Sequence, residues 1–567
     1  MMSNKHYDRA TRAALIFLLV SSGAAAQTIP DAGTLLRENE RQERRLPVPA
    51  PQAVPQAPAA APKDGLRVVV KSFRISGNTL IATADLQAAL APWIGKEAGF
   101  AELQQAVNAI AEEYRRRGWF ARPQLPAQDV NEGVIEINVI EGRLGAVRID
   151  DGGAVLRVDR GLIEGTMTAR QKPGDPLNLE LLERSNSILN DTPGVAVATV
   201  LAPGANAGET DAVVKVQDKQ LAAGMLQLDN QGARSTGKDK LSASVSLDNP
   251  LGIGDQVQLY ANASQGSDYL KLGYSLPLGR DGLRAGIGAS AMKYHLVGDF
   301  AVSKSKGDAQ TLGLNASYPL LRSGTRNVAL ALAADRKDYH NEANQVSTSE
   351  KKIDALVVAF SGDSLDGLGQ GGMTLWGVNL GAGRVDLAGN AANATADQNG
   401  ARTGGSYTKL GYSLSRLQRA SDEATLWASF NGQRAGKNLD SSEKLSLGGP
   451  SGVRAYPVIE GIGDDGFVGT LEARYSVLPE VQLTALYDFG SVRQSHDTSY
   501  AGAPLANKVT LRGAGLGMGW SQPGKYSLRA VWARRIGANP LLNPLSGKDS
   551  DGSLDLNRVW LTAVAYF

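Results

Sequence analysis

Two short stretches near the C-terminus place an arginine and a carboxylate where they could form a directed ion pair. Residues 452–456 read GVRAY and contain Arg454, whereas residues 486–490 read LYDFG and contain Asp488. An arginine guanidinium binds a carboxylate directionally, often through two parallel hydrogen bonds. The pair can form only if the two stretches meet, so the elements that carry them decide the matter.

Arg454 lies in a long predicted connection, residues 435–466. Its central part, residues 447–466, reads LGGPSGVRAYPVIEGIGDDG and contains many glycines, among them Gly448, Gly449 and Gly452. A loop this long is either functional or disordered. The combination of a cation, an aromatic ring and permissive glycines favours a functional loop.

Asp488 lies in residues 481–490, where apolar and polar side chains alternate. A period of two places successive side chains on opposite faces of a sheet. If Leu483 and its apolar neighbours face lipid, Asp488 and Gly490 face a lumen. A long loop folding inward would then bring Arg454 to Asp488. In a wet lumen this ion pair would fix the position of the loop more than it would add to stability. The alternative is that Asp488 is an ordinary polar residue of the lumen.

The same alternation recurs from strand to strand over residues 221–567 and ends on the aromatic Phe567. Tilted strands of about 9–11 residues are typical of barrels in outer membranes. We therefore predict a transmembrane antiparallel β-barrel of about sixteen strands over residues 220–567, with a bore wide enough for a conduit. The predicted strands begin near Gly224, Lys240, Gln256, Tyr269, Gly282, Ala309, Arg326, Lys352, Gly371, Ser406, Ala424, Phe467, Val481, Lys508, Lys525 and Asn557.

The N-terminal residues 1–26 have the three parts of a secretory signal peptide. Three basic residues precede an apolar core at residues 13–20, and the small residues 24–26 offer a cleavage site. A short anchor helix is the alternative, but the apolar core is too short to span a bilayer. The remaining chain is expected to act outside the inner membrane.

A polar helix and a linker are predicted next, at residues 27–46 and 47–65. Residues 31–46 favour a helix but present almost no apolar face, so this helix is either solvated or disordered, or it lies in a wet, polar cavity. Six prolines among alanines occupy residues 47–62. Such a linker is extended and semi-rigid, and it lets the helix reach a site away from the following segment.

Two similar units are predicted at residues 66–143 and 144–219, each with the order β-α-α-β-β. In the first, Leu103, Val107 and Ile110 fall on one face of a helix. These are small α+β modules with exposed sheet edges, and such an edge can accept an extended peptide as an added strand. The alternative is that the modules are spacers.

Composition excludes several classes of function. The 59 Lys and Arg residues nearly balance 57 Asp and Glu residues and are scattered, which argues against nucleic-acid binding. There is no cysteine, and the four histidines lack ligand spacing, so no metal or thiol chemistry is indicated. We find no phosphate-binding motif and no GxSxG or HExxH motif. We therefore expect no enzyme and no cofactor.

The GGPSGVRAYP segment, the LYDFG strand and the closing Phe567 resemble the TpsB-type transporters of two-partner secretion in Gram-negative bacteria, the haemolysin secretion/activation family. The resemblance covers nearly the whole chain. It implies that the two modules are periplasmic POTRA modules and that the polar helix plugs the barrel. It also implies that the long loop is the sixth extracellular loop and folds into the lumen.

The resemblance also assigns roles at the loop tip. By position, Arg454 matches the tip arginine and Asp488 the aspartate of the inner wall, while Val453 and Tyr456 occupy the flanking places of the tip motif. This chain has Ala455 where the common pattern has glycine. Glycine adopts positive φ at low cost and alanine does not. The sequence therefore does not determine the backbone geometry of the tip at this position.

The function implied is an outer-membrane transporter that recognises one large secreted partner in the periplasm and passes it through the barrel. The partner is expected to be β-helical, with an N-terminal secretion domain that docks on the POTRA modules. Outer-membrane lipid is the other expected contact. A monomer is expected, with a weak dimer as the alternative.

Three other functions compete with this interpretation. A barrel-assembly insertase belongs to the same superfamily, but such proteins usually carry more periplasmic modules and lack a polar plug helix. A general porin does not need tandem modules. An outer-membrane enzyme would need a nucleophile or base placed with its carboxylates, and none is evident.

Overall fold

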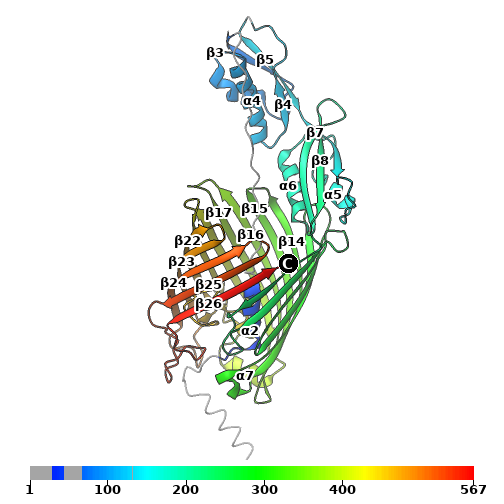
Figure 1. Cartoon of the computed structure of the whole chain (residues 1–567). Helices are drawn as coiled ribbons and strands as arrows, with labels where there is room; N and C mark the ends of the chain where they lie inside the picture. The colour runs from blue at the N-terminus through cyan, green and yellow to red at the C-terminus, as the bar shows by residue number, and fades with distance from the viewer. Residues whose placement is uncertain (1–28, 44–66, 131) are drawn as a thin grey trace, which may run out of the picture.

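The computed structural model describes residues 29–43, 67–130 and 132–567. The predicted signal peptide and linker lie outside the described residues. Figure 1 shows a barrel with two small modules stacked beyond one rim and a helix, α2, inside the barrel. No described helix has both the length and the apolar character that crossing a bilayer requires.

Within the described residues, sixteen antiparallel strands close into one barrel, as predicted. The largest error in the predicted strand starts is at β16, which begins at Val346 and not near Lys352, because polar residues extend this hairpin past the alternating pattern. The strands are β9 (Ala222–Asp229), β10 (Lys240–Asp248), β11 (Gln256–Ser264), β12 (Ser267–Pro277), β13 (Arg284–His295), β14 (Lys306–Arg322), β15 (Arg326–Ala343), β16 (Val346–Asp366), β17 (Gly372–Asp386), β18 (Gly405–Arg419), β19 (Ala424–Ala435), β22 (Asp465–Leu478), β23 (Val481–Arg493), β24 (Lys508–Gln522), β25 (Tyr526–Arg535) and β26 (Asn557–Tyr566).

Strand β23 shows how side-chain alternation sets the two faces of the barrel. Leu486, Asp488 and Gly490 are buried, whereas Leu483 and Ala485 are exposed on the outer face. An apolar outer face suits lipid, and the opposite face is free to carry polar groups. The predicted parity of this strand is therefore present in the fold.

The barrel closes where the last strand meets the first. The N–H of Phe567 donates to the carbonyl of Gly224 at 3.0 Å, and the N–H of Gly224 donates back at 2.9 Å. A Cβ built on Gly224 would lie 2.4 Å from the Phe567 ring, so glycine makes room for the terminal aromatic. The C-terminal residue thus completes the seam between β26 and β9.

The two modules share the order β-α-α-β-β that the sequence predicted. The first consists of β2 (Ser72–Ser76), α3 (Thr83–Leu90), α4 (Phe100–Arg116), β4 (Ala121–Gln124) and β5 (Val134–Glu141), with β1 (Val68–Val69), η1 (Ala91–Trp93) and β3 (Glu97–Ala98) beside them. The second consists of β6 (Arg143–Asp150), α5 (Arg160–Met167), α6 (Leu179–Asp191), β7 (Val195–Pro203) and β8 (Glu209–Asp218).

Each module buries the apolar face of its helices against a three-stranded sheet. The sheet orders are β2-β5-β4 and β6-β8-β7, so the last strand of each module lies in the middle of its sheet. On α4, Val107, Ile110 and Tyr114 are at most 2% exposed. The outer strands β2, β4, β6 and β7 provide the sheet edges that the sequence pattern indicated.

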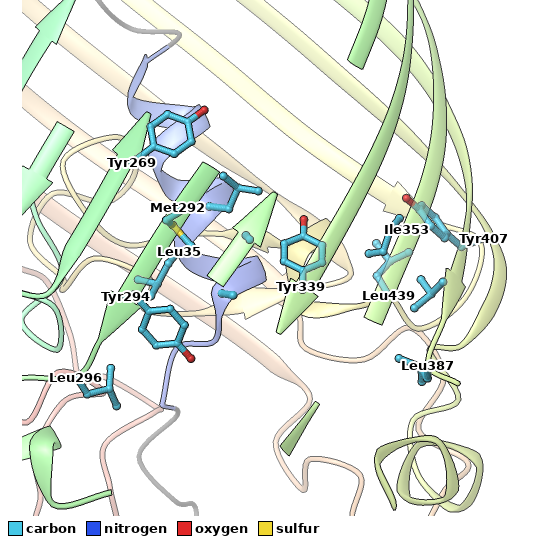
Figure 2. Close-up of a cluster of buried hydrophobic side chains, with 14 of the residues drawn as sticks. Leu35, Tyr269, Met292, Tyr294, Leu296, Tyr339, Ile353, Leu387, Tyr407 and Leu439 are labelled. Carbon is cyan, nitrogen blue, oxygen red and sulfur yellow. The ribbon is translucent and has the colours of Figure 1, made fainter. Parts of the chain in front are cut away.

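Helix α2 (Ala32–Glu43) lies in the barrel and begins after Asp31, whose Oδ1 accepts from the N–H of Thr34 at 2.9 Å. This is an ordinary N-cap. Leu35 and Leu36 are at most 5% exposed and join a cluster of inward tyrosines. Figure 2 shows Leu35 close to Met292 and Tyr294. The surroundings of the helix are therefore less polar than its sequence indicated.

Candidate functional site: the contents of the barrel lumen

The connection between β19 and β22 folds into the barrel, and we call its residues 436–464 the tip loop. It begins with η3 (Ser441–Glu443) and then forms a small hairpin of β20 (Leu445–Ser446) and β21 (Ile462–Gly463). Between these strands the chain makes a compact turn, in which the N–H of Val453 donates to the carbonyl of Leu447 at 2.7 Å. Val453 and Leu447 are fully buried.

Arg454 reaches from the tip loop to the inner face of β23. Its Nε donates to Asp488 Oδ2 at 2.8 Å, and its Nη2 donates to Asp488 Oδ1 at 2.7 Å. The backbone N–H of Arg454 donates to the same carboxylate at 3.1 Å. This is the bidentate geometry that gives an arginine–carboxylate pair its directionality. The structure thus brings together the two residues that the sequence singled out.

A second carboxylate, Glu472 on the neighbouring strand β22, shares the guanidinium. Arg454 Nη1 donates to Glu472 Oε1 at 2.6 Å, and Arg474 Nε donates to Glu472 Oε2 at 2.8 Å. Arg454 and Glu472 are each 6% exposed, and Asp488 is fully buried. Taking such charges out of water costs several kcal/mol per ion, so the cluster is favourable only while its partners stay in place.

Sequence reasoning missed Glu472 and Trp560. Trp560 on β26 donates its Nε1–H to the backbone carbonyl of Arg454 at 2.8 Å, which ties the tip to a further strand of the wall. Strand parity could have found Glu472, since it lies between the exposed Leu471 and Ala473 and must face inward. No sequence signal pairs Trp560 with the tip loop.

Tyr456, the other flanking residue of the tip, packs under a cation. The Arg535 guanidinium carbon lies 4.6 Å from the centre of the Tyr456 ring. Such a cation–π contact is stronger when both groups are desolvated. Arg535 is in turn held by Asp549, which accepts from Nη1 at 3.0 Å. Tyr456 is fully buried, so the tip is anchored on two sides.

The glycines of the tip loop permit close approach of backbone to backbone. A Cβ built on Gly452 would lie 1.9 Å from the carbonyl oxygen of Leu447. Gly449 has φ +92°, a conformation that other residues rarely adopt. Gly448 and Gly490 likewise lie against neighbours that leave no room for a side chain.

Ala455 fits the tip because the wall has a glycine opposite it. The φ of Ala455 lies outside the left-handed range, so alanine carries no backbone strain there. A Cβ built on Gly513 of β24 would lie 2.6 Å from the methyl carbon of Ala455. The departure from the family pattern therefore changes a wall contact and leaves the tip backbone relaxed.

Helix α2 and the tip loop touch each other within the lumen. Arg37 Nη1 donates to the carbonyl of Ser442 at 3.2 Å. Arg41 Nη1 donates to the carbonyl of Ser446 at 3.2 Å, and its Nη2 donates to the carbonyl of Ser451. Both arginines therefore bind backbone carbonyls of the loop that carries Arg454, which couples the positions of the two elements.

Deleting residues 32–43 should raise the ionic conductance of the purified protein several-fold in planar bilayers. The reason is that α2 occupies the lumen together with the tip loop and supplies many of its buried contacts. A matched control deletes the outer-loop helix α7 (Ala391–Asn399), which has no buried residue. Equal conductance of the α2-deleted and wild-type proteins would show that the helix does not limit the bore.

The second module is fastened to the barrel rim through Asp281, in the turn between β12 and β13. Arg170 donates from Nε to Asp281 Oδ1 at 2.9 Å and from Nη2 to Oδ2 at 2.8 Å. Arg184 on α6 donates to the same carboxylate at 3.2 Å. A second pair joins Arg322 Nε to Asp191 at 2.6 Å. These contacts hold the second module against the rim of the barrel.

Replacing Asp281 by alanine should loosen this joint, seen as wider distance distributions between spin labels on the second module and the barrel. Burial alone would raise the pKa of Asp281, but hydrogen bonds from Arg170 and Tyr318 and the charge of Arg184 lower it overall. A carboxyl whose pKa is lowered in the folded state stabilises the joint at every pH above its ordinary pKa of about 4. This stabilisation is lost as the pH falls through the lowered pKa.

The joint should therefore stay intact from pH 7 to pH 5 and loosen only below about pH 4. The matched control is Asp299→Ala in η2 (Gly298–Ser303). This carboxylate pairs with Arg234, and its side chain is 74% exposed, compared with 32% for Asp281. Identical distance distributions for wild type and Asp281→Ala would contradict this account of the joint.

Within the described ranges, no group of three or more His, Asp or Glu side chains is placed to hold a metal ion. The lumen instead contains paired charges, tyrosine rings and backbone carbonyls. The ion pairs and the hydrogen bonds to carbonyls can be exchanged for equivalent contacts with another polypeptide segment.

Comparisons with known proteins agree with this architecture. A family model described as haemolysin secretion/activation protein ShlB/FhaC/HecB matches residues 208–520, and one described as POTRA domain, ShlB-type, matches residues 68–142. The heme/hemopexin transporter protein HuxB of Haemophilus influenzae is 25% identical over 588 residues and covers 100% of both chains. The outer membrane transporter CdiB of Escherichia coli is 26% identical over 504 residues, 83% of this chain and 81% of its own. The solved structure of CdiB from Escherichia coli shares the fold, with a TM-score of 0.68 at 22% identity and 100% coverage of both chains.

A closed barrel with POTRA modules at one rim and an occupied lumen defines a class of outer-membrane protein transporters. The chain belongs to the haemolysin secretion/activation family, whose model covers more than half of its length. It is an outer-membrane transporter of two-partner secretion in a Gram-negative bacterium, with its POTRA modules in the periplasm. The family consists of transporters, and the match favours this function over the barrel-assembly alternative.

Proposed function

We propose that this transporter exports one large secreted partner, which it receives on the POTRA modules and passes through the lumen in extended form. The observation that carries the proposal is the coupled seating of α2 and the tip loop. Both fill the bore, and Arg37 and Arg41 join them through hydrogen bonds to backbone carbonyls. Contacts of this kind exchange readily with those of an incoming chain.

The sheet edges of the modules support the first step. Strands β2 and β4 are the outer strands of the first module's sheet, and β6 and β7 are those of the second. An extended segment of the partner's N-terminal secretion domain would add to one of these edges through main-chain hydrogen bonds. The Asp281 joint then holds the second module at the mouth of the barrel.

The driving force in this proposal is folding of the partner outside the cell. The sequence has no phosphate-binding motif, so nucleotide hydrolysis by this chain is not part of the account. A β-helical partner would fold as it emerges, and folding would prevent its return. An unfoldable partner variant that is still exported at the normal rate would count against this step.

The relatives' names describe different systems, a heme/hemopexin transporter and a CdiB transporter. The identity of the partner of this chain is therefore open. A very long, repetitive secreted protein encoded beside this gene is the expected partner, and we expect the transporter to act as a monomer.

The test is a secretion assay with that neighbouring reading frame in cells that contain or lack the transporter. We expect the partner in the medium only when the transporter is present, while the levels of other outer-membrane proteins stay unchanged. Export without the transporter would overturn the proposal. A general loss of outer-membrane proteins in its absence would favour the insertase alternative.

A further inference from the structure

Five lysines point into the lumen from the half of the barrel formed by β10 to β18. They lie on five different strands. In the strand register Lys271 is paired with Tyr260, and Lys351 is paired with Tyr339. Lys240 and Lys351 are only 7% and 4% exposed. We call these residues the lysine wall: Lys240 on β10, Lys271 on β12, Lys337 on β15, Lys351 on β16 and Lys409 on β18.

Carboxylates of α2 and of the tip loop pair with four lysines of the lysine wall. Lys351 Nζ donates to Asp31 Oδ2 at 3.1 Å and to Asp440 Oδ1 at 2.9 Å. Lys271 Nζ donates to Glu43 Oε1 at 2.9 Å. Asp31 and Glu43 stand at the two ends of α2, and Asp440 precedes η3 in the tip loop.

The remaining members of the lysine wall also contact the tip loop or α2. Lys337 Nζ lies 3.6 Å from Glu443 of the tip loop, and Lys409 donates to the same carboxylate. Lys240 donates to the amide oxygen of Gln42 on α2. The two elements inserted into the bore thus supply partners for the cations of the wall.

The opposite side of the barrel carries charges of both signs. On β22 and β23 the inward carboxylates Glu472 and Asp488 accept hydrogen bonds from Arg454 of the tip loop, and Glu472 also accepts one from Arg474 of its own strand. Arg529 on β25 lies 3.8 Å from Glu472. The lysine wall is therefore a cluster of cations on one side of the bore, and a one-sided cluster of this kind orients a charged segment in a confined space.

Departure of α2 would leave Lys271 without Glu43 and Lys351 without Asp31. The twelve steps from Asp31 to Glu43 span about 18 Å at the helical rise. An extended chain covers that distance in about five or six residues. Two carboxylates spaced five or six residues apart on an extended polypeptide could therefore occupy both vacated positions.

We propose that the lysine wall is a binding site for acidic side chains of the extended secreted polypeptide, which replace Asp31 and Glu43 when α2 leaves the lumen. The proposal rests on the proposed function, since it assigns a chemistry to the chain in transit. An incoming acidic segment competes directly with the helix for its lysines, so entry of the partner and displacement of α2 become one exchange reaction.

The test uses the full-length chain with Asp31→Asn and Glu43→Gln, which weakens the helix's hold on the lysine wall. Single channels in planar bilayers at 0.1 M KCl are exposed on the periplasmic side to a Gly/Ser decapeptide carrying two Glu residues six positions apart. We expect reversible current block by this peptide but not by versions with Gln or Lys at those positions. Raising the salt to about 1 M should relieve the block through screening.

Lysine variants then locate the binding site. Adding Lys271→Gln and Lys351→Gln should weaken the block at least tenfold, whereas Lys271→Arg and Lys351→Arg should retain it. The matched control is Lys352→Gln, which neighbours Lys351 on β16 but points outward, with its side chain 57% exposed. Equal block by Glu and Lys peptides, or equal weakening by Lys351→Gln and Lys352→Gln, would overturn the proposal.

Two further measurements keep the outcomes distinct. If the variant channels give no open current, binding of the same peptides to detergent-solubilised protein is measured by calorimetry, with the same expected order. Export of the partner is assayed separately in cells. Normal export with no preference for the Glu peptide would overturn this inference alone, whereas loss of any dependence of export on the transporter would overturn the proposed function.

Discussion

Replacing Arg454 by alanine should reduce export of the secreted partner by at least on the order of tenfold, while the barrel still inserts into the outer membrane. The substitution leaves Asp488, which is fully buried, and Glu472 without the guanidinium that both carboxylates contact. Breaking a buried pair in this way costs about 3–5 kcal/mol, because one charge remains uncompensated. The tip loop should therefore leave its seat on β22 and β23.

The barrel itself should survive, since the strand ladders do not depend on the pair. Insertion is checked by heat-modifiable migration of the outer-membrane fraction, and export by the amount of partner in the medium. Asp488→Ala should act in the same direction, and Asp488→Asn more weakly, because the amide oxygen still accepts a hydrogen bond. Arg512→Ala on the exposed face of β24 is the matched control. Wild-type export by both Arg454→Ala and Asp488→Ala would remove the pair from the mechanism.

Strand parity explains why the inward position of Asp488 could be predicted from sequence. Asp488 faces inward because Leu483 and Ala485 face outward, and a closed sheet gives every strand only two sides. Periodicity of a single strand was enough for this step, because it depends on local alternation and not on the neighbouring strands. The inward folding of the long loop, and with it the pairing of Asp488 with Arg454, was implied by the family resemblance.

Contacts between distant strands could not be predicted in this way. Trp560 meets the carbonyl of Arg454 across 106 residues of sequence. Gly513 accommodates Ala455 only because the register of β24 places the two residues opposite each other. Periodicity determines which face a side chain occupies, but not which residue of another segment lies in front of it.

The surroundings of α2 could not be predicted from sequence for a related reason. Its residues are compatible with water, and no pattern within residues 31–46 distinguishes solvent from a polar cavity. The tyrosines of β11 to β18 decide the matter, because they belong to the same buried cluster as Leu35 and Leu36. A helix with few apolar residues can therefore be buried where the wall supplies aromatic side chains with polar ends.

A reversible block of export is expected when α2 is cross-linked to the tip loop through Gly33→Cys and Ser442→Cys. A Cβ built on Gly33 lies 2.8 Å from the Cβ of Ser442, and a relaxation of about 1 Å reaches the usual Cβ separation of a disulfide. The chain has no cysteine of its own, so the introduced pair is the only one that can form. Under oxidising conditions the helix cannot leave, the bore stays filled, and export should fall to background.

Adding reductant should restore export, since each substitution alone removes no charged partner of α2 or of Arg454. The matched control is a disulfide between Ser491→Cys and Thr510→Cys, whose hydroxyl oxygens lie 3.0 Å apart across β23 and β24 on the outer face. That cross-link stiffens the wall but leaves the bore contents free, so export should continue. Continued export with the Gly33 and Ser442 positions fully oxidised would mean that the partner passes beside α2, and the exchange of helix for secreted chain would have to be abandoned.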